Sequence, residues 1–150
     1  MTRKATKPEA RKPPTAGGGK EPLVLIVDDV QDNRTVYVLF LRFSGFRVAE
    51  AENGVEALRQ AEALVPDIIV MDLSLPVMDG WEATRHLKRG RRTEGIPVIA
   101  LTGHALPEHA KAAREAGCDL VITKPCLPDQ LVDAIRRILD SSKLRPKGGR

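Results

Sequence analysis

The 150-residue sequence is poor in the features that mark several large classes of protein. Aromatic residues make up only 3% of it, too few for a surface that stacks the bases of single-stranded nucleic acid. No apolar run approaches the roughly 20 residues that span a bilayer, and the N-terminal segment lacks the apolar stretch of a secretory signal. The two cysteines, Cys118 and Cys126, have no CxxC or metal-type spacing, which favours reduced thiols over a disulfide. These absences predict a soluble, cytoplasmic protein of one domain.

The net charge of +4 comes from the two ends of the chain. Residues 1–20 have a balance of +5 and residues 141–150 a balance of +4, which leaves −5 for residues 21–140. Both ends are also rich in proline and glycine, a composition that buries too little apolar surface to offset the entropy of ordering the chain. We therefore expect a disordered basic tail at 1–20, one domain at 21–140 and a second disordered basic tail at 141–150. Attraction to a polyanion and a role as soluble linkers are both compatible with such tails.

Between the tails, short apolar runs alternate with segments of helical periodicity. The runs predict strands at residues 23–27, 47–51, 68–71, 98–101 and 120–122. Helices are predicted from an N-cap at Asp32 to a stop at Gly45, and at residues 54–64, 80–88, 106–116 and 128–139. The first helix has an apolar stripe on one face: Val36, Leu39, Phe40 and Phe43. Strict alternation predicts an α/β fold, a doubly wound parallel sheet of five strands with helices on both faces.

Charged and hydroxyl side chains stand at the carboxyl ends of four predicted strands. The first strand ends in Asp28 and Asp29, the third in Asp72, the fourth in Thr102 and the fifth in Lys124. In an open α/β sheet, ligands bind at these ends, where the winding direction switches. Each residue alone could simply start a turn. Three carboxylates, one hydroxyl and one ammonium at a single edge predict a functional site.

The chemistry of these side chains indicates phosphoryl transfer that depends on magnesium. Three close carboxylates repel one another unless a cation neutralises them, and Mg²⁺ prefers such oxygen ligands together with water and phosphate oxygens. A carboxylate can also attack a phosphoryl group and form an acyl phosphate, whose oxygens Lys124 and Thr102 would contact. The sequence has no P-loop motif, so the expected donor is another protein or a small acyl phosphate.

These residues lie in the motifs VDDV, MDLSLPVMDG, ALTGHA and TKP. With these motifs in this order, residues 21–140 resemble the receiver domain of two-component response regulators. The resemblance implies the CheY-like strand order 2-1-3-4-5. It also implies that Asp72 is the phosphoacceptor and a ligand of Mg²⁺. Asp29 would bind the ion directly, Asp28 largely through a metal-bound water, and the backbone carbonyl of Ser74 would be a further ligand.

The resemblance assigns switch and output roles as well. Thr102 would hydrogen-bond the phosphoryl group, Lys124 would pair with it, and the bond between Lys124 and Pro125 would be cis. His104 occupies a variable position that shields the acyl phosphate from water in the family, so a tuning role and simple exposure are both open. Val121 departs from the family, which has an aromatic residue three positions before the lysine. Without that ring, we expect activation to be carried by the loop after Thr102 and by the start of the next helix.

The sequence as a whole predicts a stand-alone response regulator, because only eleven mostly polar residues follow Leu139. The expected partners are a sensor histidine kinase or a histidine phosphotransfer protein, and an unknown downstream protein. Neither a membrane nor a nucleic acid is expected as a partner. The protein would catalyse only its own phosphorylation and dephosphorylation. Two alternatives stay open: a DNA-associated regulator that acts through the basic tails, and a phosphatase-like enzyme, which would need a second acid that no DxD motif supplies.

Overall fold

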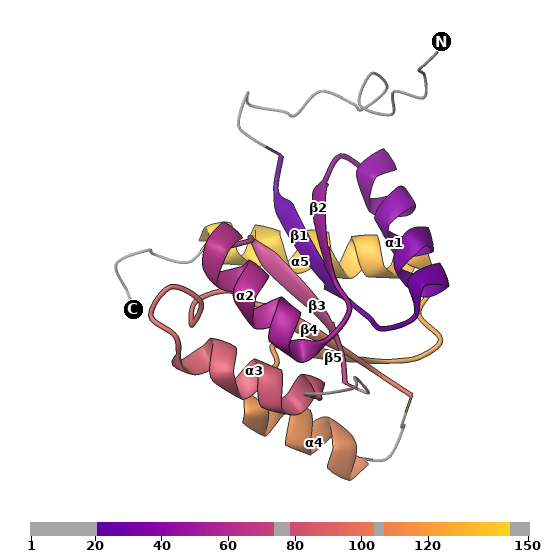
Figure 1. Cartoon of the computed structure of the whole chain (residues 1–150). Helices are drawn as coiled ribbons and strands as arrows, with labels where there is room; N and C mark the ends of the chain where they lie inside the picture. The colour runs from indigo at the N-terminus through magenta and orange to yellow at the C-terminus, as the bar shows by residue number, and fades with distance from the viewer. Residues whose placement is uncertain (1–20, 74–78, 104–106, 145–150) are drawn as a thin grey trace.

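The computed structural model describes residues 21–73, 79–103 and 107–144, with side chains up to residue 141. Within these ranges, five strands and five helices alternate along the chain (Figure 1). They are β1 (Leu23–Val27), α1 (Gln31–Phe43), β2 (Arg47–Ala51), α2 (Gly54–Leu64), β3 (Ile68–Asp72), α3 (Gly80–Arg89), β4 (Val98–Thr102), α4 (Pro107–Ala116), β5 (Leu120–Thr123) and α5 (Pro128–Leu144). No helix of the described ranges is both long and apolar enough to cross a bilayer.

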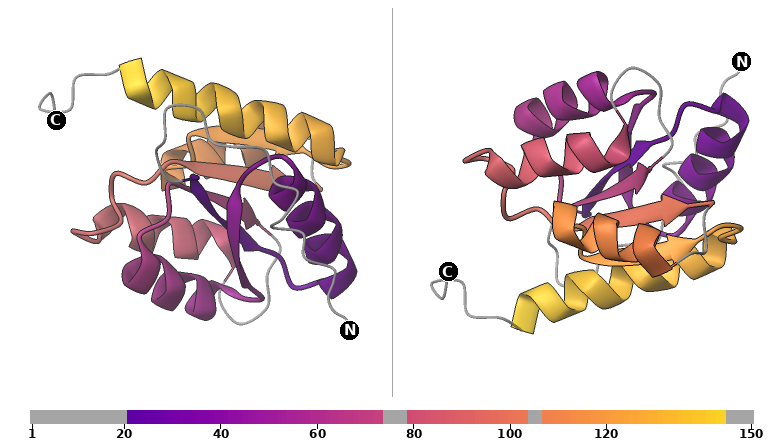
Figure 2. Two further views of the ribbon diagram at one scale, coloured as in Figure 1. Left: turned by 90° about the horizontal axis from the view of Figure 1, so that it is seen from above. Right: turned by 90° about the horizontal axis from the view of Figure 1, so that it is seen from below.

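The strands form one parallel sheet in the order β2-β1-β3-β4-β5. The predicted doubly wound α/β fold is therefore confirmed, with the mixed strand β2 at an edge. Helices α1 and α5 cover one face of the sheet, and α2, α3 and α4 cover the other (Figure 2). The winding direction reverses between β1 and β3, so the carboxyl ends of these two strands flank the crevice in which such sheets bind ligands.

The continuous apolar runs are explained by a core on each side of the sheet. In β1, Leu25 and Val27 contribute to the core under α2, α3 and α4, whereas Val24 and Ile26 contribute to the core under α1 and α5. Strand β3 divides its residues in the same way. The two cysteines are free and buried in opposite cores, and burial raises the pKa of both thiols.

The apolar stripe of α1 points away from the sheet. Val38 and Leu41 are the buried residues of this helix, whereas Phe43 of the stripe is 76% exposed. The other stripe residues, Val36, Leu39 and Phe40, are exposed as well. Because α1 is apolar on two sides, helical periodicity alone does not choose which side meets the core.

Several helix ends differ from the predicted ones. The predicted N-cap at Asp32 is wrong, because α1 begins at Gln31 after Val30 and Asp32 lies in its first turn. The backbone N–H of Val30 donates to the Asp28 carboxylate, and this turn starts the helix early. Helix α5 continues to Leu144, four residues into the segment predicted as a tail. The next residue unable to continue a helix is Pro146.

Candidate functional site

Three carboxylates meet at the carboxyl ends of β1 and β3. Oxygen atoms of Asp28, Asp29 and Asp72 all lie within 4.8 Å of one another. Asp28 and Asp72 are only 2% and 3% exposed, whereas Asp29 is open to solvent. Ligands about 2.1 Å from an octahedral Mg²⁺ ion are roughly 3–4 Å apart, so this cluster needs only a small contraction to hold one. A set of oxygen donors with one side open to water suits a magnesium ion.

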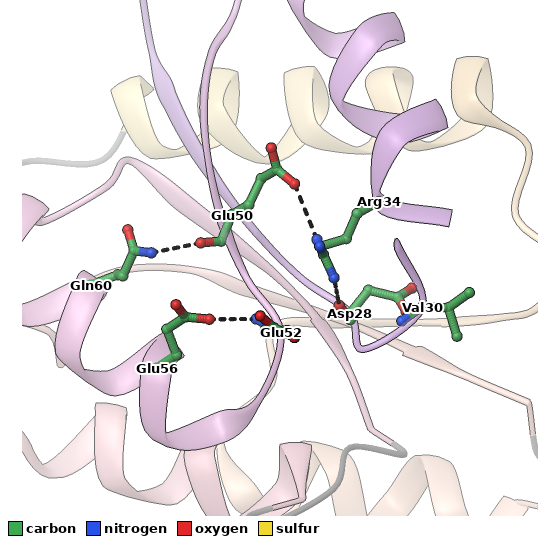
Figure 3. Close-up of polar contacts among 7 residues, drawn as sticks. All are labelled: Asp28, Val30, Arg34, Glu50, Glu52, Glu56 and Gln60. Atoms are coloured by element: carbon green, nitrogen blue, oxygen red, sulfur yellow. Dashed lines mark hydrogen bonds and ion pairs between the residues drawn. The ribbon is translucent and has the colours of Figure 1, made fainter. Parts of the chain in front are cut away.

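The loop between β1 and α1 presents the first two carboxylates. The backbone N–H of Asp28 donates to the carbonyl of Ala51 at 3.1 Å, which ties the end of β1 to the end of β2. Oδ1 of Asp28 then accepts a hydrogen bond from the N–H of Val30 at 2.8 Å (Figure 3). One oxygen of this carboxylate is thus held by the backbone.

The environment of Asp28 opposes its negative charge. Burial is the main cause, and it raises the pKa of this carboxyl above the ordinary value of 3.8. The hydrogen bond from Val30 acts against the rise, as does the charge of Lys124, while the negative charges of Asp72 and Asp29 add to it. A divalent cation would reverse this balance by neutralising the cluster.

Lys124 supplies a positive charge beside Asp72. Its Nζ lies 3.0 Å from Oδ2 of Asp72, in a pair whose carboxylate side chain is almost fully buried. The backbone N–H of Lys124 also donates to the carbonyl of Thr102 at 2.7 Å, which holds the end of β5 against the end of β4. The peptide bond to Pro125 is cis, as the resemblance implied.

Thr102, at the carboxyl end of β4, lies at the same edge of the sheet as the aspartates. It is buried and ends its strand one residue beyond Leu101, which pairs with Asp72 across the sheet. The backbone N–H of Leu73 donates to the Leu101 carbonyl at 3.0 Å, so the chain after Asp72 stays next to β4. The structure thus brings all five residues predicted from the strand ends to one edge of the sheet.

Comparison with known proteins assigns the family. The sequence model of the response regulator receiver domain matches residues 24–136. The chain belongs to this family. It is 34% identical over 116 residues to the polar-differentiation response regulator DivK of Brucella anthropi, which covers 77% of this chain and 94% of the relative. The resemblance to two-component receivers is therefore confirmed.

Solved receiver structures agree with the fold. The chemotaxis response regulator CheY4 of Vibrio cholerae superposes with a TM-score of 0.76 at 28% identity, covering 79% of this chain and 99% of that one. The receiver domain of sensor histidine kinase PA1611 from Pseudomonas aeruginosa has a TM-score of 0.75 and 34% identity, with 80% and 98% covered. That structure contains a magnesium ion coordinated in its active-site cleft.

Gly80 is a residue of this receiver whose importance the motif did not reveal. Its place in MDLSLPVMDG is typical of the end of a turn, and its N–H donates weakly to the Leu73 carbonyl at 3.3 Å. A Cβ at this position would overlap the carbonyl oxygen of Asp72 and press on Cα of Leu73. Only glycine lets α3 start this close to the end of β3.

The residues expected to carry the output are only partly within the described ranges. His104 lies outside the described residues, as does Ser74, whose carbonyl was expected to be a magnesium ligand. Val121 is half-buried in β5, opposite Ala100, and packs against the core under α2, α3 and α4. Trp81, at the start of α3, stacks on His109 of α4 with ring centroids 5.9 Å apart. This ring contact joins α3, which follows β3 along the chain, to α4, which follows β4 and Thr102.

Proposed function

We propose that the protein is a response regulator that accepts a phosphoryl group on Asp72 from a sensor histidine kinase or a histidine phosphotransfer protein. The observation that carries the proposal is the buried Asp72 carboxylate, with Lys124 Nζ at 3.0 Å and carboxylate oxygens of Asp28 and Asp29 within 4.8 Å. The shared family explains why these groups occur together, and the magnesium ion in the active-site cleft of the PA1611 receiver supports the same ion here.

In the proposed reaction, a carboxylate oxygen of Asp72 attacks the phosphorus of the phosphohistidine. The P–N bond breaks, the imidazole nitrogen keeps the electron pair and takes up a proton, and an acyl phosphate forms on Asp72. Lys124 stabilises the negative charge on the transferred group, and the Thr102 hydroxyl donates a hydrogen bond to one of its oxygens. A magnesium ion held by Asp29, Asp72 and the Ser74 carbonyl, and by Asp28 largely through a bound water, would neutralise the remaining charge at the phosphoryl oxygens. Water later attacks the phosphorus of the acyl phosphate, the P–O bond to Asp72 breaks, and inorganic phosphate leaves, which restores the carboxylate.

The proposed output is contact with a downstream protein in the cytoplasm. The DivK and CheY4 relatives are matched over 94% and 99% of their own lengths, so the receiver accounts for almost all of each. The acyl phosphate changes the charge of the edge formed by β1, β3, β4 and β5. Val121 has no ring to move, so we propose that α4 and the loop before it carry the change to the partner.

Incubation with a labelled small acyl phosphate tests this function. We expect the protein to take up label only with Mg²⁺, and the label to be lost in hydroxylamine, which cleaves acyl phosphates. Asp72→Asn is expected to take up none, while Asp67→Asn, at the opposite end of β3, serves as a control that labels normally. Equal labelling of Asp72→Asn would contradict the proposal.

A further inference from the structure

Arg34, on α1, forms hydrogen bonds to the loop after β1 and to β2, next to the cluster of Asp28, Asp29 and Asp72. It lies one turn into α1, and its Nη1 donates to the backbone carbonyl of Asp28 at 2.8 Å (Figure 3). Its Nε donates to Oε1 of Glu50, on β2, at 3.1 Å. Only 12% of the side chain is exposed. The bond to the Asp28 carbonyl is partly buried and uses a charged donor, so it is stronger than an ordinary surface contact, whereas the Glu50 side chain is 42% exposed and its bond to Arg34 is open to solvent.

The carbonyl that Arg34 holds belongs to the peptide between the two aspartates. A peptide unit is planar, so fixing the direction of its C=O group also fixes ψ of Asp28 and φ of Asp29. These two angles determine where both side chains leave the backbone. Val30, the N-cap residue of α1, has no polar side chain with which to order this loop. The guanidinium therefore controls a peptide whose orientation decides whether the two carboxylates converge.

The position of Arg34 is itself secured through β2. The backbone carbonyl of Glu50 accepts a hydrogen bond from Nε2 of Gln60, on α2, at 2.6 Å. Two residues on, the N–H of Glu52 donates to Oε1 of Glu56 at 2.8 Å (Figure 3). The backbone at the end of β2 is thus held by α2, which keeps Glu50 next to the guanidinium.

We propose that Arg34 is a positioning residue for the divalent cation of the receiver, acting through the Asp28–Asp29 peptide. The inference rests on the proposed function for the use of this cation in phosphoryl transfer. The two hydrogen bonds of the Arg34 side chain go to the Asp28 carbonyl and to Glu50 rather than to the carboxylates of the cluster. Its role is therefore to direct the carboxylates, and neutralisation of the site is left to the cation and Lys124.

The test compares Mg²⁺ affinity in the full chain without any phosphoryl donor. We expect Arg34→Ala to raise the Mg²⁺ dissociation constant, measured by calorimetry, about tenfold, as removal of a group that orients metal ligands commonly does. Arg42→Ala removes the same charge from an exposed site on the same helix and should leave the constant within about twofold, since screened surface charges act weakly at a distance. Arg34→Lys keeps the charge but not the planar fork, so its affinity should lie between the other two.

Variants of Glu50 test whether this residue affects Mg²⁺ binding through Arg34. Glu50→Ala should weaken Mg²⁺ binding by about threefold, and the double variant Arg34→Ala/Glu50→Ala should bind no more weakly than Arg34→Ala, because Glu50 acts through Arg34. If Arg34→Ala fails to fold in a thermal melt, Arg34→Lys and Glu50→Ala decide the question. An unchanged constant in the folded variants, full rescue by lysine, or an equal loss in Arg42→Ala would overturn the proposal.

Phosphorylation separates this inference from the proposed function. With a small acyl phosphate, Arg34→Ala should need more Mg²⁺ to reach half of its maximal rate, while the maximal rate itself stays near that of the wild type. A lowered maximum at saturating Mg²⁺ would contradict a role confined to the cation. Wild-type protein that binds Mg²⁺ but is never phosphorylated on Asp72 would instead refute the proposed function.

Discussion

Replacing Asp28 with asparagine should stabilise the protein in the absence of metal. Asparagine keeps the shape of the side chain and an oxygen for the Val30 N–H, but it removes a buried negative charge. The oxygens of Asp29 and Asp72 lie within 4.8 Å, so the change relieves two repulsive pairs. The variant thus isolates the electrostatic cost of assembling this site.

The size of the effect follows from the spacing of the charges. Two like charges 4.8 Å apart repel by about 3.5 kcal/mol at an effective dielectric constant of 20, and by about 0.9 kcal/mol in water. Asp29 is exposed and Lys124 offsets part of the repulsion, so we expect a net gain of about 1–2 kcal/mol. For a domain of this size, that gain raises the Tm by roughly 4–8 °C.

The stability gained in Asp28→Asn should depend on pH. Burial, followed by the charges of Asp72 and Asp29, raises the pKa of Asp28 above its unfolded value of 3.8. Between pH 3.8 and the raised pKa, the folded wild type therefore binds more protons than the unfolded chain. It loses stability as the pH rises through the raised pKa. The free energy of unfolding of Asp28→Asn should exceed that of the wild type most at neutral pH. This difference should disappear as the pH falls below 3.8, where both side chains are neutral.

Thermal unfolding in EDTA, followed by titration with Mg²⁺, provides the assay. The wild type should gain about 1.4 kcal/mol when free Mg²⁺ reaches ten times its dissociation constant, and Asp28→Asn should gain less. Asp29→Asn, at the exposed member of the cluster, is the matched control and should stabilise less in EDTA. If Asp28→Asn were less stable than the wild type in EDTA at neutral pH, it would be wrong that repulsion among the three carboxylates destabilises the folded protein.

Three further predictions concern the surroundings of the site. Gly80→Ala should lower the Tm and slow phosphorylation together, because its Cβ would overlap the Asp72 carbonyl; normal labelling in this variant would contradict the close packing of α3. Val121→Ala should cost about 1–2 kcal/mol in denaturant unfolding and leave labelling intact, since the valine is a half-buried core residue. Trp81 is the single tryptophan and stacks on His109, so its fluorescence should change on adding a beryllofluoride mimic of the acyl phosphate with Mg²⁺. In His109→Ala that change should shrink, and an unaltered signal there would show that α4 does not move against α3.

The parallel sheet and its edge residues could be predicted because both depend on local patterns, whereas the strand order followed only from the family resemblance. Continuous apolar runs indicated strands buried on both faces, and their alternation with helices predicted a parallel sheet. In such a sheet the residues after the strands must share an edge, which brings Asp72 and Lys124 within 3.0 Å. The pairing is thus a consequence of topology, although the two residues are 52 positions apart.

The contacts that order the site could not be predicted in the same way. The bridge from Arg34 to Glu50 depends on how α1 is rotated on the sheet, and the apolar stripe of α1 does not reveal that rotation. The steric demand at Gly80 depends on how closely α3 approaches β3. Both features arise from packing between elements, and a periodicity within one element holds no information about it.

Chemical trapping of the phosphorylated residue tests the central claim most directly. Borohydride reduces an acyl phosphate of aspartate to homoserine, which peptide mass spectrometry locates in the sequence. After incubation with a phosphorylated histidine kinase and Mg²⁺, we predict homoserine at Asp72 and unmodified Asp28 and Asp29. Homoserine at either of the β1 aspartates, or a stable phosphoryl group on a histidine or serine with Asp72 intact, would contradict phosphoryl acceptance by Asp72.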